Sequence, residues 1–132
     1  MARVVRSAHR VSHDPRQALG RSGEDVACQE LQRRGYAILE RRYRTRLGEI
    51  DIVALDGRTT VFVEVKARSG SDFGEGAEAV TPWKQRRIGR MALDYASRHR
   101  LHDSPCRFDV VTVDLEGAEP RVEVYRHAFD LS

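Results

Sequence analysis

The sequence predicts a single α/β domain whose elements follow the order α-β-β-β-α-β-β. A chain of 132 residues is long enough for one domain with a modest core. Two runs rich in strand-forming residues, 48–55 and 59–67, flank Asp56-Gly57-Arg58, which is typical of a β-hairpin. Two segments near residues 22–34 and 82–99 carry apolar residues at helical spacing between helix start and stop signals.

Residues 1–15 differ from the rest of the chain. They lack a hydrophobic period and end in Asp14-Pro15, so we expect a flexible basic tail followed by one domain over residues 16–132. No apolar run is long enough to cross a membrane, and the basic N-terminus lacks the apolar stretch of a secretory signal. We therefore expect a cytoplasmic protein without membrane contact, in which Cys28 and Cys106 are reduced structural thiols.

The first helix is predicted most securely from Ser22 to Arg34. Ser22 is a suitable N-cap, Asp25 places an acid in the first turn, and Gly35 is a suitable stop. Glu24 falls on the same face as the apolar stripe, where an acid must find a partner or a metal. The stripe consists of Ala27, Cys28 and Leu31.

The strands come next. Residues Tyr36–Tyr43 predict a first strand, and Arg44–Leu47 a basic connection to the hairpin. After the hairpin, Ser69–Gly76 is a Gly/Ser-rich loop, and a last hairpin pairs residues 107–115 with 121–127.

The second helix begins at Pro82, with Thr81 as its N-cap, and runs to about His99. Its expected core stripe consists of Ile88, Met91, Ala92 and Tyr95.

Basic charge is concentrated in two segments. The net charge of +3 divides into +4 over residues 1–21 and +5 over 33–46, while 22–32 and 47–132 each carry −3. This distribution favours a polyanionic partner that is contacted on one side. The alternative is a solvated arginine-rich surface, because the chain has 21 arginines and only two lysines, Lys66 and Lys84. Against that background, a lysine marks a position where a compact cation with a shiftable pKa serves better than a guanidinium.

The central hairpin groups four charged residues on one face. If Gly57 and Arg58 are the central residues of its turn, Asp51 lies opposite Glu64 and Glu49 opposite Lys66. The other face is apolar and is expected to pack against a helix. It consists of Ile50, Ile52, Ala54, Val61, Val63 and Val65.

Acidic residues on a central strand repel one another and lose hydration, and a divalent cation resolves that conflict. Mg²⁺ (or Mn²⁺) commonly takes one or two carboxylates, with water and substrate phosphate as its other ligands. Lys66 would then orient or deprotonate the attacking water, or offset charge that develops on the phosphate. The alternative is a cross-strand ion pair between Glu49 and Lys66 on an exposed face.

Asp51, followed after the hairpin by Glu64-Val65-Lys66, resembles the D…ExK core of the PD-(D/E)xK nuclease superfamily, with Ile50 where its name places proline. Glu24 matches the helical acid of the Holliday-junction-resolvase-like branch. The resemblance is closer still to the YraN-like family of small bacterial proteins, and covers residues 20 to about 129. It rests on Gly23-Glu24, 48–54 (GEIDIVA), 61–66 (VFVEVK), Ala79-Val80, Lys84 with Arg87, and 107–111 (RFDVV).

The resemblance implies a restriction-endonuclease-like core, a mixed sheet flanked by helices. It also implies that Asp51, Glu64 and the main chain of Val65 bind the metal, that Lys66 is catalytic, and that Glu24 assists at the metal. Arg42 stands where YraN-like sequences usually have asparagine.

Four basic residues are candidates for binding the nucleic-acid backbone. Lys84 and Arg87 lie near the start of the second helix, where exposed amides also suit a phosphate. Arg42 and Arg44 flank Tyr43, which is either a stacking ring or a core residue. The alternative for all four is a solvated surface.

Two residues are assigned by position. Asp109 supports the site or makes a structural hydrogen bond, and Trp83 is expected in the core.

The leading hypothesis is a Mg²⁺- or Mn²⁺-dependent nuclease that acts on DNA rather than RNA, on branched or flapped structures. Its catalytic residues would be Lys66, Glu24 and Glu49. A nucleic-acid-binding module that keeps the nuclease fold without turnover is the second hypothesis, and a protein-interaction scaffold the third. Junction-resolving proteins of this superfamily are symmetric dimers, so a homodimer is expected by analogy.

Overall fold

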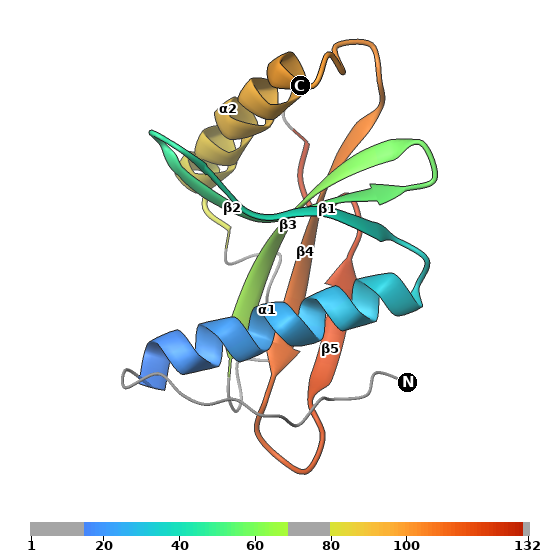
Figure 1. Cartoon of the computed structure of the whole chain (residues 1–132). Helices are drawn as coiled ribbons and strands as arrows, with labels where there is room; N and C mark the ends of the chain where they lie inside the picture. Colours follow the sequence, from blue (N-terminus) through green and yellow to red (C-terminus); the bar gives the residue numbers. More distant parts are fainter. Residues whose placement is uncertain (1–14, 69–79, 131–132) are drawn as a thin grey trace.

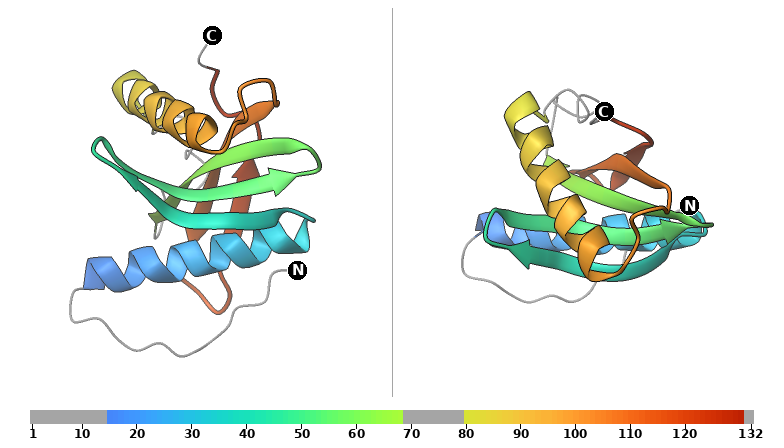
Figure 2. Two further views of the ribbon diagram at one scale, coloured as in Figure 1. Left: turned by 45° about the horizontal axis from the view of Figure 1, so that its top comes forward. Right: turned by 90° about the horizontal axis from the view of Figure 1, so that it is seen from above.

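The computed structural model describes residues 15–68 and 80–130, which form a five-stranded sheet with one helix on each face (Figures 1 and 2). The predicted element order is confirmed, and the predicted basic tail and Gly/Ser-rich loop lie outside these ranges. The elements are α1 (Pro15–Arg33), β1 (Ala37–Thr45), β2 (Gly48–Asp56), β3 (Thr59–Arg68), α2 (Pro82–Arg98), β4 (Cys106–Asp114) and β5 (Arg121–Tyr125).

The sheet is mixed, as the resemblance implies, and is consistent with a nuclease-like core. Its strand order is β1-β2-β3-β4-β5. Only β3 and β4 run parallel, and all other neighbours are antiparallel. Because α2 lies between β3 and β4 in the chain, it supplies the crossover that parallel neighbours require.

The first helix starts earlier than predicted. It begins at Pro15, so Ser22 and Asp25 lie in the helix interior, and their assignment as N-cap and first-turn acid is wrong. Proline suits a first helical position because its missing N–H has no helical partner there. The predicted stop at Gly35 is confirmed: Gly35 has φ +98, and the Tyr36 N–H donates to the Leu31 carbonyl at 2.9 Å.

The second helix matches its prediction closely. Thr81 caps it by accepting a hydrogen bond from the Lys84 N–H at 3.2 Å. The predicted stripe is buried and forms the centre of the core on the α2 face. That core consists of Tyr43, Ile50, Val53, Phe62, Val80, Ile88, Met91, Ala92, Tyr95, Phe108, Val110 and Phe129.

A second core fills the α1 face of the sheet. It consists of Val26, Ala27, Cys28, Leu31, Tyr36, Ile52, Ala54, Val61, Val63, Val111 and Val113. Ile50 was expected on this face but packs with the α2 core, so that prediction is wrong. The backbone of β1 is distorted at the same level: Arg42, between the partners of Ile52 and Ile50, has a left-handed φ of +57. The alternation of faces along β2 is therefore broken at Asp51.

Tyr43 is a core residue rather than a stacking ring. It is buried, makes an edge-to-face contact with Tyr95 at 5.1 Å, and donates its hydroxyl hydrogen bond to Asp94. Both cysteines are free, as expected. No helix in the described ranges is long and apolar enough to cross a membrane.

Candidate metal centre

The candidate site lies where β2 and β3 separate. The predicted turn register is confirmed, with Leu55 opposite Thr60, but the paired positions end at Ile52 and Val63. Asp51 and Glu64 are the next residues on each strand, so they stand at the opening instead of forming a further ladder pair. The Val65 N–H, freed from the ladder with β2, donates to Asp51 Oδ2 at 2.7 Å.

Among the described carboxyl groups, that of Asp51 has the most strongly shifted pKa. Burial, the neighbouring Glu64 and Glu24 raise the pKa of its carboxyl to about 7, against an ordinary value of 3.8. The hydrogen bond from Val65 and the charge of Lys84 act in the opposite direction and do not compensate. The ionised form of Asp51 is therefore short of positive charge.

Glu64 is 9% exposed and meets both lysines of the chain. The Lys84 Nζ lies 2.6 Å from Glu64 Oε2, and the Lys66 Nζ lies 4.0 Å from the same oxygen. Burial by itself would lower the pKa of Lys84, but the hydrogen bond and charge of Glu64 outweigh it and raise the pKa. The two rare lysines thus converge on one carboxylate, from β3 and from the first turn of α2.

Glu24 approaches from α1 but is held by arginines. Its Oε1 accepts from Arg42 Nε at 2.9 Å and from Arg41 Nη2 at 3.4 Å, and its side chain is 13% exposed. Glu24 still contributes to the raised pKa of Asp51, which places its charge within reach of the site. The acid on the inward stripe of the first helix has therefore found its partner in Arg42.

Glu49 lies at the edge of the site. It forms an ion pair with Arg44 at 2.9 Å, and the side chains of Glu49 and Arg44 are 37% and 77% exposed. Its expected place opposite Lys66 has no counterpart in the ladder, which ends at Ile52, three residues from Glu49. Of the acidic residues predicted for the site, Glu49 is therefore the one at its edge, paired with Arg44.

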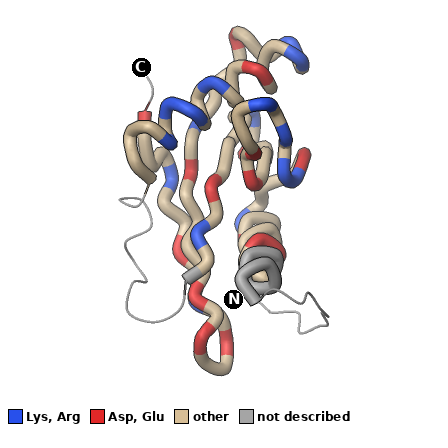
Figure 3. The backbone as a smooth tube through the Cα atoms, turned by 90° about the vertical axis from the view of Figure 1, so that its left-hand side faces the viewer, with Lys and Arg blue, Asp and Glu red and all other residues tan. Residues whose placement is uncertain are grey.

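The predicted backbone-binding residues have different surroundings. Lys84 turns into the acidic cluster, and Arg42 and Arg44 pair with Glu24 and Glu49. Arg87 places its guanidinium 4.7 Å from the centroid of the Trp83 ring. Figure 3 shows that basic positions concentrate in the half of the molecule that carries α2 and the β1–β2 turn, away from the acidic β4–β5 turn.

Trp83 was expected in the core, and that prediction is wrong, since its side chain is 62% exposed. The sequence contains the signal: Trp83 is the second residue of α2 and is off the stripe formed by Ile88, Met91 and Tyr95.

The donor set suits a hard divalent cation. Within residues 15–68 and 80–130, no three His, Cys, Asp or Glu side chains gather closely enough to hold a metal. Mg²⁺ needs fewer, because it keeps several waters and binds through one or two carboxylates. Asp51, Glu64 and the Val65 carbonyl offer only oxygen, and the under-compensated charge of Asp51 favours an added cation. The residues present therefore fit Mg²⁺ or Mn²⁺.

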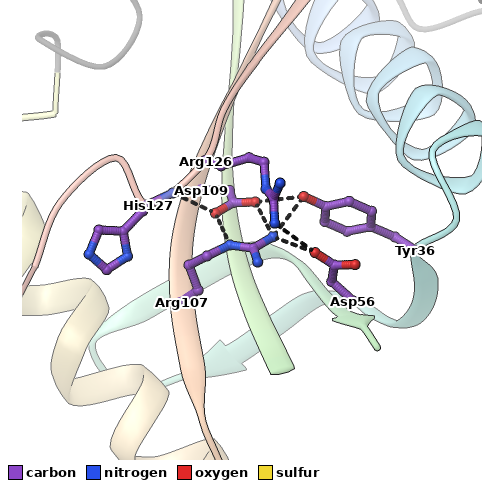
Figure 4. Close-up of polar contacts among 6 residues, drawn as sticks. All are labelled: Tyr36, Asp56, Arg107, Asp109, Arg126 and His127. Carbon is purple, nitrogen blue, oxygen red and sulfur yellow. Dashed lines mark hydrogen bonds and ion pairs between the residues drawn. The ribbon is translucent and has the colours of Figure 1, made fainter. Parts of the chain in front are cut away.

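Asp109 belongs to a separate, structural network (Figure 4). It is fully buried and accepts from Tyr36 at 2.9 Å, from Arg107 at 2.8 and 3.0 Å, and from the His127 N–H at 3.0 Å. Arg107 also reaches Asp56 at 3.0 Å, at the β2–β3 turn. Asp109 therefore links Tyr36, which follows α1, to β4 and the C-terminal segment. Of the two roles predicted for it, the structural hydrogen bond is the one that the structure shows.

The chain matches one family of known sequences over most of its length. The model of "Uncharacterised protein family UPF0102" matches residues 23–113. A UPF0102 protein of Geobacter metallireducens is 46% identical over 115 residues, which are 87% of this chain and 94% of that protein. A UPF0102 protein of Anaeromyxobacter dehalogenans is 48% identical over 117 residues, 89% of this chain and 87% of that protein. The match begins at Gly23 and Glu24 and includes the whole candidate site.

Proposed function

Given that the chain belongs to the uncharacterised protein family UPF0102, the YraN-like family of the sequence resemblance, we propose that it is a Mg²⁺- or Mn²⁺-dependent nuclease that cleaves DNA with branched or flapped structure. The observation that carries this proposal is the convergence of Asp51, Glu64, Lys66 and Lys84 where β2 and β3 separate.

Each residue has a role that follows from its chemistry. The carboxylates of Asp51 and Glu64, with the Val65 carbonyl, would hold the metal. When bound, such an ion polarises the phosphoryl oxygens and lowers the pKa of a coordinated water. Lys66 would orient or deprotonate the attacking water, or offset negative charge on the phosphate as the bond breaks. Glu24, within electrostatic reach of Asp51, would assist from α1.

Lys84 gains a role beyond backbone binding. Its ammonium lies 2.6 Å from Glu64 Oε2 and offsets that charge directly, which lowers the repulsion between the carboxylates of the site. It would also supply positive charge next to a phosphate, as a compact point charge.

The test is cleavage of defined DNA substrates. Purified protein is incubated with junction, flap, single-stranded and blunt duplex DNA, with Mg²⁺, with Mn²⁺ and with chelator. We expect metal-dependent cleavage that falls at least about 100-fold in Lys66→Ala, as for removal of a general base or a charge-stabilising group. Glu116→Gln, an exposed acid on the β4–β5 turn, is the matched control and should cleave like the wild type. Equal cleavage by Lys66→Ala would refute the catalytic assignment.

A second function, nucleic-acid binding without turnover, has one observation in its favour. Lys84 pairs with Glu64 at 2.6 Å, and such an ion pair also suits a purely structural role for these two residues. This alternative predicts salt-sensitive DNA binding that survives Lys66→Ala, with no cleavage of any substrate. Absence of binding at low salt would instead favour the protein-interaction scaffold.

A further inference from the structure

An exposed apolar and basic surface is formed by the start of α2 and the β1–β2 turn. Trp83 at the start of α2 and Leu47 in the β1–β2 turn are 62% and 41% exposed. They line a shallow hollow of about 250 Å³ together with Arg86, Arg87 and Arg90. Pockets for drug-sized ligands span about 300–1,000 Å³, so this hollow suits a single ring system.

Arg87 organises this hollow. Its guanidinium stacks on Trp83, one helical turn away, at 4.7 Å. The same guanidinium lies 3.7 Å from the position that a Cβ on Gly48 would occupy, and Gly48 has φ +135, so glycine is needed there. The Arg87 Nε is buried without a hydrogen-bond partner. Arg87 therefore lies between the β1–β2 turn and the indole, and its guanidinium covers one face of the Trp83 ring.

The hollow is lined by three arginines, Arg86, Arg87 and Arg90. No carboxylate pairs with Arg86, Arg87 or Arg90 among the residues that the structure describes. An exposed indole backed by a guanidinium and flanked by two more arginines combines a stacking surface with phosphate-binding groups.

We propose that this surface, the Trp83 platform (Leu47, Trp83, Arg86, Arg87 and Arg90), binds an unpaired nucleobase by stacking on Trp83. The inference rests on the proposed nuclease function and narrows its substrate class to nucleic acid with a single-stranded segment at the site. A base inside a duplex has both faces covered by its neighbours and cannot stack on the indole. Trp83 directly precedes Lys84, whose Nζ contacts Glu64, so the platform and the candidate metal centre share the first turn of α2.

Trp83 is the only tryptophan of the chain, so intrinsic fluorescence reports on this platform alone. The protein is titrated in chelator and low salt with a twelve-nucleotide poly(dT) strand, and separately with blunt duplex DNA. We expect quenching by the single strand and little change with the duplex at equal nucleotide concentration. Stacking on an aromatic ring is worth about 1–3 kcal/mol per base, which corresponds to a loss of about 5- to 150-fold in affinity.

Variants separate stacking from charge. Binding of a labelled strand, followed by fluorescence anisotropy, should weaken by that factor in Trp83→Ala and much less in Trp83→Phe. Leu93→Ala is the matched control, because Leu93 is a 71% exposed apolar residue on the same helix outside the platform. Trp83 is exposed, so its replacement should leave the circular dichroism spectrum and the unfolding midpoint unchanged.

The outcomes distinguish this inference from the function on which it rests. Wild-type affinity in Trp83→Ala, or equal quenching by strand and duplex, overturns the stacking site even if metal-dependent cleavage is found. Trp83-dependent, strand-selective binding without any cleavage supports the platform and refutes the nuclease activity.

Discussion

Replacing Asp51 by asparagine should stabilise the metal-free protein while abolishing metal binding. The carboxyl titrates at 3.8 in an unfolded chain and at about 7 in the fold, chiefly because it is buried and lies near Glu64. Between these values the folded protein retains a proton that the unfolded chain has released. The free energy of unfolding of the wild type therefore falls as pH rises through this window.

The magnitude follows from the shift. A shift of about three pKa units corresponds to about 4 kcal/mol, and this cost is complete only above pH 7. Asparagine carries no charge and keeps an oxygen to accept the Val65 N–H, but its buried amide retains part of the desolvation cost. We therefore expect Asp51→Asn to be about 1–3 kcal/mol more stable than the wild type at pH 8, and nearly equal to it at pH 4.

The assay is urea unfolding in chelator at pH 4, 6 and 8, followed by circular dichroism. Glu116→Gln is the control for removing an exposed carboxylate and should follow the wild type. Added Mg²⁺ should stabilise the wild type by about 2.7 kcal/mol at 100 times its Kd and leave Asp51→Asn unchanged. A stability difference that is the same at every pH, or an asparagine variant less stable than the wild type at pH 8, would refute this account of the site.

Two further substitutions test how α1 and β1 are held at the site. In Gly23→Ala the new Cβ would lie 2.8 Å from the Ala67 Cβ on β3. We therefore expect urea unfolding to show a loss of about 1–3 kcal/mol of stability, which the double variant Gly23→Ala/Ala67→Gly should restore. A double variant as unstable as Gly23→Ala would contradict this contact. Arg42→Asn should be about 0.5–1 kcal/mol more stable than Arg42→Gln, because both lose the ion pair with Glu24 but asparagine tolerates the left-handed φ of +57. Equal unfolding midpoints of these two variants would show that the backbone at residue 42 is not strained.

The left-handed φ of +57 at residue 42 gives a physical reason for the asparagine that YraN-like sequences usually have there, because asparagine tolerates this conformation better than most residues. The residue interrupts the β1–β2 ladder opposite Asp51, where β2 also leaves β3. At this point Ile50 and Ile52 face different cores, and Asp51 between them lies at the opening of the hairpin. The sequence resemblance marked the position, but only the φ angle explains why its side chain is restricted.

Local chemistry was enough to predict most of the fold. The two-residue turn at Gly57 and Arg58 sets the register of the central hairpin, and Thr81-Pro82 sets the start of α2. The alternation along β3 places Glu64 and Lys66 on one face. These features depend on neighbours within a few residues, so the sequence by itself determined them, together with the acid–acid–lysine set of the candidate site.

The tertiary structure decided which charged groups meet and which rings stay exposed. Lys84 reaches Glu64, Glu24 is held by Arg42, and Trp83 remains in solvent. It also extended α1 back to Pro15, since Ser22 is a permissible cap but does not enforce one. Such outcomes depend on where helices dock and where a strand kinks, and these depend on packing between residues far apart in the chain. The hairpin was therefore readable from the sequence, while the partners of its carboxylates required the fold.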